Sequence, residues 1–125
     1  MKVRRWLPPL LWAGVILLGT SLPQDAVPVQ TSGIDKILHF TIYTVFAFLL
    51  TLAITEGFRL WQAVVLAIAF TMAFGAVDEW HQQLIPGRFP EFNDWVADSL
   101  GAVAGALIAA LVTVRRRGRE TVHST

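Results

Sequence analysis

The chain has 125 residues, of which 54% are hydrophobic and only 15% are charged. A soluble domain of this size exposes too much surface to hide so many apolar side chains, so the composition excludes both a disordered chain and an ordinary soluble globule. The sequence contains no cysteine, which excludes a disulfide scaffold, a thiolate zinc site and a cysteine nucleophile. Lipid is the remaining solvent for such a chain.

Four long stretches with few ionisable side chains predict an all-α integral membrane bundle of four transmembrane helices. They cover residues 6–22, 37–55, 60–77 and 95–114. Each is close to the length that crosses a hydrocarbon core as a helix. We expect a single membrane domain over residues 1–117 and a frayed cytoplasmic tail over residues 118–125.

The first stretch has an alternative interpretation, because a basic start followed by an apolar run is also typical of a cleavable signal peptide. Its length, Pro8 and Pro9, and the poor cleavage site before Asp25 favour an uncleaved anchor. Removal of this stretch would not change the orientation of the other three.

Basic residues orient the predicted helices, because short cytoplasmic segments carry an excess of Lys and Arg. With four crossings, most of the basic residues lie on the side that holds both termini and the turn at residues 56–59. Only Lys36 and Arg88 lie on the other side, where most of the acidic residues also lie. The sequence therefore predicts that both termini are cytoplasmic.

Polar side chains recur at helical spacing near the outer ends of the second, third and fourth stretches, so those of one helix share a face. A charged side chain within a bilayer costs about 2.5–3.5 kcal/mol at mid-helix, and such groups therefore turn inward and pair. We predict a polar pocket that opens to the outer leaflet. The predicted ligand-binding residues are Lys36, His39, Tyr43, Glu79, Gln82, Arg88, Asp94 and Asp98.

Packing offers a structural alternative for some of these positions. Asp98 can serve as an interhelical hydrogen-bond partner, and His39 can pair with Glu79 or Asp98 only to fix the register of the helices. Gly101 and Gly105 form a small-xxx-small pattern that permits close helix contact, and we assign both to helix packing.

Four ordered blocks carry the most specific pattern in the sequence. They read Asp35-Lys36-Ile37-Leu38-His39-Phe40-Thr41-Ile42-Tyr43, Asp78-Glu79-Trp80-His81-Gln82, Pro86-Gly87-Arg88 and Asp94-Trp95-Val96-Ala97-Asp98, with Gly101 and Gly105 following. Their order, type and spacing resemble the VanZ-like family. The resemblance implies a small multi-span protein of the bacterial plasma membrane, in a family whose named founder lowers susceptibility to teicoplanin. It implies site residues at Lys36, His39, Tyr43, Glu79, Gln82, Arg88, Asp94, Asp98 and Gly101.

These observations lead to two main hypotheses about function. The first is a non-enzymatic cell-envelope protein whose pocket binds a lipid-linked cell-wall precursor or a glycopeptide, with Lys36 and Arg88 as the cations that meet a phosphate. It would thereby lower susceptibility to teicoplanin-type antibiotics.

The alternative is a membrane-embedded hydrolase of a lipid substrate. In that case His39, Glu79 and Asp98 would hold a divalent metal or act as acid and base. Their spacing matches no metal motif, so we predict neither a metal nor another cofactor. A proton-coupled exporter is disfavoured because the first stretch has no acid. Membrane lipids are the expected partners, a second copy of the chain is a candidate partner, and nucleic acid is not expected.

Overall fold

The computed structural model describes residues 3–26 and 32–123, and within these ranges all regular structure is helical. The described residues form four α-helices and two short 3-10 helices. In chain order these are the 3-10 helix Val3–Arg5, α1 Leu7–Thr20, the 3-10 helix Gln24–Ala26, α2 Ser32–Ile54, α3 Leu60–Gln82 and α4 Phe92–His123.

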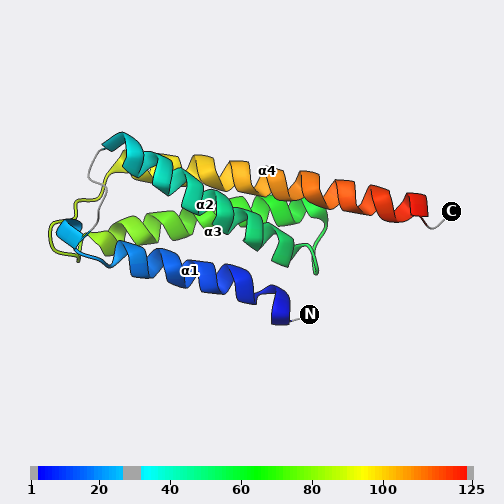
Figure 1. Ribbon diagram of the computed structural model, residues 1–125, viewed down its shortest axis with the longest axis horizontal. Helices are drawn as coiled ribbons and strands as arrows, with labels where there is room; N and C mark the ends of the chain where they lie inside the picture. The colour runs from blue at the N-terminus through cyan, green and yellow to red at the C-terminus, as the bar shows by residue number, and fades with distance from the viewer. Residues whose placement is uncertain (1–2, 27–31, 124–125) are drawn as a thin grey trace.

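The helices lie side by side in one elongated bundle (Figure 1). α2, α3 and α4 contact one another, and α1 packs against α2 and α3. Both chain ends lie toward the same side, which we call the terminal end and which also holds the turn between α2 and α3. The opposite side holds the 3-10 helix Gln24–Ala26 and the connection from α3 to α4, and we call it the loop end.

In the part of the chain that the structure describes, three of the four α-helices are long and apolar enough to cross a membrane: Gly33–Ile54, Leu60–Gln82 and Phe92–His123. α1 has 14 residues, which rise about 21 Å, against a hydrocarbon core of about 30 Å. Large apolar side chains are exposed on every helix, among them Leu10, Leu38, Phe70 and Leu107. An apolar surface of this extent suits lipid rather than water.

The helices extend beyond the predicted stretches. α2 begins before residue 37, α3 continues past residue 77, and α4 begins before residue 95. The predicted boundaries were set at the first or last charged residue, but at the loop end the charged side chains pair within the bundle and the helices continue through them. At the other end α4 runs to His123, so residues 118–123 are helical. The arginines there favour helix, and a single Gly118 costs only about 1 kcal/mol.

α2 and α4 approach each other closely at two glycines. A Cβ atom built on Gly101 would lie 2.5 Å from the carbonyl oxygen of Phe40, and one built on Gly105 would overlap the carbonyl oxygen of Thr44. Both glycines are buried. The glycine face of α4 is therefore covered by α2 of the same chain.

α1 is attached to the bundle by apolar and polar contacts. Ile16 is buried against Tyr43 and Phe46, and Trp12 packs at the edge of the same core. The indole Nε1 of Trp12 donates a hydrogen bond to the carbonyl oxygen of Ile42 at 2.9 Å. At the terminal end, Arg5 forms an ion pair with Glu56 at 2.8 Å.

Candidate functional site

Polar side chains of α2, α3, α4 and the connection between α3 and α4 meet at the loop end, where they form one network that we call the polar cluster. It includes all eight residues that the sequence assigned to ligand binding, together with Asp35, Asp78 and Glu91. Its members are Asp35, Lys36, His39, Tyr43, Asp78, Glu79, Gln82, Arg88, Glu91, Asp94 and Asp98.

The pair between His39 and Asp98 joins α2 to α4 at the centre of the cluster. His39 Nδ1 lies 2.8 Å from Asp98 Oδ1, and Asp98 is fully buried. The second oxygen of Asp98, Oδ2, is buried and has no hydrogen-bond partner among the described residues. Gly75 of α3 leaves room for it, because a Cβ atom there would lie 3.1 Å from Oδ2. Asp98 is thus an acid with one partnered and one unpartnered oxygen.

Asp78 is a second buried acid, and it is fully supplied with donors. Thr20 of α1 donates its hydroxyl to Oδ1 at 2.7 Å, and Tyr43 of α2 donates its hydroxyl to Oδ2 at 3.1 Å. The amide of Gln82 also donates to Oδ2, at 3.4 Å. Asp78 therefore joins α1, α2 and α3 through neutral donors.

The two cations of the loop end, Lys36 and Arg88, differ in the charge of their hydrogen-bond partners. Lys36 Nζ lies 2.5 Å from Asp94 Oδ1 and 2.8 Å from Glu91 Oε2, so its charge is balanced by two carboxylates. Glu79 supports the same region by accepting a hydrogen bond from the backbone N–H of Glu91 at 3.2 Å. Lys36 and Glu79 thus both fix the start of α4.

Arg88 instead contacts neutral oxygens. Its Nε donates to the carbonyl oxygen of Leu22 at 2.8 Å, Nη2 donates to that of Gly19 at 3.3 Å, and Nη1 donates to the side chain of Gln82 at 3.4 Å. These bonds satisfy carbonyl groups at and just beyond the end of α1. No carboxylate of the described residues lies within ion-pair distance of Arg88. A guanidinium has five N–H groups, so two remain for a ligand.

A pocket of about 220 Å³ lies between α1 and α2 beside the cluster. Most of its lining is apolar, including Val15 and Ile16 of α1 and Leu38 and Ile42 of α2. The polar side chains of the lining are those of Thr20, Asp35, His39, Tyr43 and Arg88.

This pocket differs from the one predicted from the sequence. His39, Tyr43 and Arg88 line it as expected. Lys36, Glu79, Gln82, Asp94 and Asp98 are not among its lining residues; Glu79, Gln82, Asp94 and Asp98 are buried behind it. The physical reason is that these side chains find partners within the bundle, so the helices close around them.

A family model described as VanZ/LLP1 matches residues 6–113. The chain belongs to the VanZ/LLP1 family. The matched range covers all of α1, α2 and α3 and most of α4, including the whole polar cluster. The comparisons found no significant match among curated proteins or among solved structures.

The sequence of this VanZ-like membrane protein pointed only partly to the residues that build the site. The sequence offers two neighbouring acids on α3, Asp78 and Glu79, and the predicted ligand-binding residues include only Glu79. The sequence does not predict that Thr20 and the carbonyl groups of Gly19 and Leu22 take part in the site. The first stretch is apolar on all sides, so its pattern does not indicate which face packs inward.

Among the residues that the structure describes, two groups of side chains in the VanZ-like bundle could hold a metal ion, and they share His39. One is Asp35, His39 and Asp94, and the other is His39, Glu79 and Asp98; within each group the candidate ligand atoms lie within 4.8 Å of one another. Imidazole and carboxylate donors suit several divalent metals. The same atoms could also exchange protons, since an imidazole held by a buried carboxylate is a common arrangement of a general base.

Proposed function

We propose that this VanZ-like membrane protein binds the headgroup of a lipid-linked cell-envelope molecule, in the pocket between α1 and α2, as a non-enzymatic binding protein. The observation that carries the proposal is the composition of the pocket. An apolar wall with a polar edge matches an amphiphile, whose chain lies against the helices and whose headgroup meets Arg88, His39 and Asp35.

The size of the pocket favours part of a lipid over a whole antibiotic. Pockets that enclose drug-sized ligands have volumes of about 300–1,000 Å³. The 220 Å³ available here falls below that range, so a glycopeptide would have to lie largely outside it. A headgroup needs less space, because its chain can continue along the exposed apolar side chains of α1 and α2, such as Val15 and Leu38.

The charges at the pocket indicate which groups the ligand carries. Arg88 is the favoured phosphate ligand, because its charge is not balanced by a carboxylate and two of its N–H groups remain. Lys36 is less suited, because Asp94 and Glu91 already hold it. Asp35 would repel a phosphate but accepts hydrogen bonds, so the proposed headgroup also carries hydroxyl or amine donors.

The proposed setting is a bacterial plasma membrane, with four crossings and both termini in the cytoplasm. The arginines at the terminal end support this orientation. α1 is short for a crossing, and local thinning of the bilayer or the adjacent 3-10 helices can accommodate the difference. In this setting the polar cluster faces the outer leaflet. A lowered susceptibility to teicoplanin-type antibiotics would then be a consequence of precursor binding.

Native mass spectrometry of the purified protein in mild detergent, with added polyisoprenyl phosphate, tests the proposal. The wild type should retain the lipid. His39→Ala and Arg88→Gln should each weaken retention about tenfold or more, because a hydrogen bond to a charged group contributes about 1.5–3 kcal/mol. His81→Ala and Arg59→Gln are matched controls whose side chains do not line the pocket, and they should retain the lipid.

Two results would refute this proposal. One is a wild type that retains no polyisoprenyl phosphate beyond the level of a neutral lipid. The other is equal retention by the wild type, His39→Ala and Arg88→Gln, which would return these residues to a purely structural role.

The compact group of His39, Glu79 and Asp98 favours a second candidate, a hydrolase of a lipid substrate. His39 lines the pocket while Asp98 holds its Nδ1, so His39 would be the base, with or without a divalent metal. The test incubates the wild type and Glu79→Gln with polyisoprenyl phosphate, with and without divalent metals. A decrease in substrate that Glu79→Gln abolishes would support this candidate. An unchanged lipid in every reaction would exclude hydrolysis of this substrate.

A further inference from the structure

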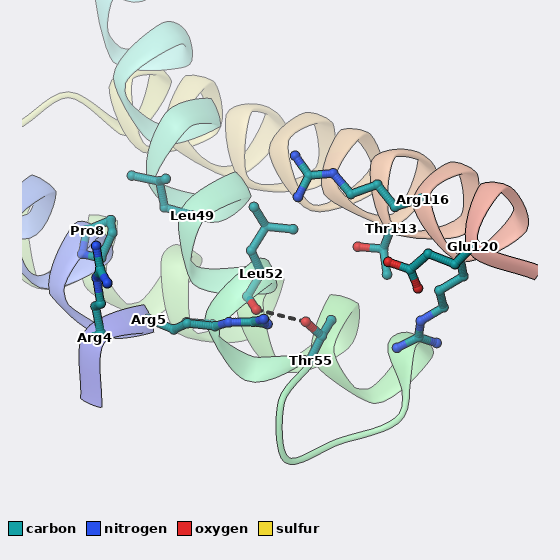
Figure 2. Close-up of a pocket in the computed structure, with 11 residues that line it drawn as sticks. Arg4, Arg5, Pro8, Leu49, Leu52, Thr55, Thr113, Arg116 and Glu120 are labelled. Carbon is teal, nitrogen blue, oxygen red and sulfur yellow. Dashed lines mark hydrogen bonds between the residues drawn. The ribbon is translucent and has the colours of Figure 1, made fainter. Parts of the chain in front are cut away.

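A second and larger pocket lies at the terminal end, far from the polar cluster, with a volume of about 680 Å³ (Figure 2). Its walls come from the start of the chain, the second half of α2 and the last third of α4. The lining residues are Arg4, Arg5, Pro8, Leu49, Leu52, Ala53, Thr55, Thr113, Arg116, Arg117 and Glu120. None of them belongs to the site described above.

Positive charge dominates this pocket. Of its four arginines, Arg5 is paired with Glu56. The guanidinium groups of Arg4, Arg116 and Arg117 form no ion pair with any carboxylate of the described residues, and Glu120 is the one acid in the lining. The pocket therefore presents more cationic donors than the protein itself uses.

The floor of the pocket is apolar. Leu49 and Leu52 of α2 lie between Arg4 and Arg5 on one side and Arg116 on the other (Figure 2). The two threonine hydroxyls of the lining do not add polarity, because Thr55 donates to the carbonyl oxygen of Leu52 and Thr113 donates to that of Ala109, each at 2.8 Å. An apolar floor below a ring of guanidinium groups fits an anion that carries a hydrocarbon chain.

We propose that this pocket binds an anionic phospholipid from the leaflet at the terminal end of the bundle. Arg116 and Arg117 of α4 and Arg4 from the other wall hold the phosphate, since guanidinium groups bind phosphate with paired N–H donors. The acyl chains lie against Leu49 and Leu52. The volume is within the range of pockets that bind small molecules. Basic pockets between helices are known to bind anionic headgroups on the cytoplasmic side of membranes.

Simple attraction between a basic helix end and an anionic membrane is the competing explanation, and α4 provides the means to separate the two. Arg116 and Arg117 line the pocket, whereas Arg115 and Arg119 of the same helix segment do not. Two double variants remove the same charge from the same two turns of α4: Arg116→Gln/Arg117→Gln and Arg115→Gln/Arg119→Gln. Only the first removes it from the pocket.

Native mass spectrometry of the full chain, titrated with phosphatidylglycerol or phosphatidylcholine, measures the difference. The wild type should retain phosphatidylglycerol preferentially. A charge-assisted hydrogen bond from a guanidinium group to the phosphate strengthens binding by about tenfold or more, so loss of both in Arg116→Gln/Arg117→Gln should weaken binding by about 100-fold. Arg115→Gln/Arg119→Gln should change it less than about twofold. Arg4→Gln, on the opposite wall, removes one such bond and should weaken binding by about tenfold.

Three results would overturn the proposal. Equal losses in the two double variants would show a diffuse charge effect without a site. Equal retention of both lipids by the wild type would exclude recognition of the anionic headgroup. Displacement of phosphatidylglycerol by millimolar inorganic phosphate would show a site for the free anion and exclude one for a lipid. The polar cluster takes no part in these measurements, so the proposal stands or fails independently of the loop-end pocket.

Discussion

Substitution of Gly105 by alanine tests the close contact between α2 and α4 most directly. At the neighbouring glycine, Gly101, a Cβ atom would lie 2.5 Å from the carbonyl oxygen of Phe40, whereas ordinary contacts begin at 3.4 Å. The helices would therefore have to separate by about 0.9 Å there. The approach at Gly105 is closer still, because its Cβ atom would overlap the carbonyl oxygen of Thr44. Gly105→Ala should push the helices apart by at least as much.

The energetic cost follows from what this separation does to the interface. A gap of 0.5–1 Å removes about a quarter to a half of the dispersion energy of each atomic contact it opens. The alanines of the same face, Ala102, Ala106 and Ala109, are all fully buried and would lose such contacts. Overpacking by a single methylene costs about 1–3 kcal/mol, and we expect a value near the top of that range. In a membrane, packing of this kind is a main source of helix association.

Thermal unfolding in mild detergent, followed by circular dichroism, measures this cost. Gly105→Ala should lower the midpoint by roughly 10 °C for a loss of about 3 kcal/mol. Gly118→Ala is the matched control, because Gly118 lies on the same helix with no atom within 4 Å of the added Cβ, and alanine should stabilise the helix by up to about 1 kcal/mol. Adding Thr44→Ala should not rescue Gly105→Ala, because the clash is with the backbone. Equal midpoints for the two glycine variants would refute the reasoning.

Three further predictions concern the cluster, α1 and the orientation. Asp98→Ala should destabilise the protein by about 3–5 kcal/mol in the same assay, because it leaves His39 buried without its partner. Asp98→Asn keeps the volume of the side chain and should cost less than half as much. An equal cost for the two variants would contradict this prediction. Trp12→Phe should cost about 1 kcal/mol through loss of the hydrogen bond to Ile42, whereas Trp61→Phe, at a side chain 63% exposed, should cost less than about 0.5 kcal/mol. A reporter enzyme that works only in the cytoplasm should be active when fused to the C-terminus, and activity of a periplasmic reporter there would reverse the proposed orientation.

The sequence predicted the helical class and the convergence of polar groups because both follow from the membrane. Helices and closed barrels are the folds that satisfy their own backbone groups in lipid, so long apolar stretches leave few alternatives. Charged side chains in such stretches must turn inward, and helical spacing then places Lys36, His39 and Tyr43 on one face. The structure brings this face against α4, where Asp94 and Asp98 meet it.

The role of α1 could not be predicted in the same way. Its side chains are apolar all around the helix, so periodicity does not indicate which face packs. The groups that attach its loop end are the hydroxyl of Thr20 and the backbone carbonyl groups of Gly19 and Leu22. A hydropathy pattern does not indicate the hydrogen bonds that backbone carbonyl groups or a single hydroxyl group will form. For this reason the predicted pocket involves α2, α3 and α4, whereas the cavity beside the polar cluster lies between α1 and α2.

The two fully buried acids of the cluster, Asp78 and Asp98, differ in how their oxygens are hydrogen-bonded. This difference assigns Asp78 to the structure of the bundle and relates Asp98 to the proposed function. Asp78 accepts hydrogen bonds at both oxygens, from three side chains on three helices, so its burial is compensated. Asp98 has His39 at one oxygen and no partner at the other within the described residues. An unsatisfied carboxylate oxygen costs stability. Asp98 does not line the pocket, but His39 both lines it and contacts Asp98. A ligand bound at His39 would therefore act on Asp98 through the imidazole, at the contact of α2, α3 and α4.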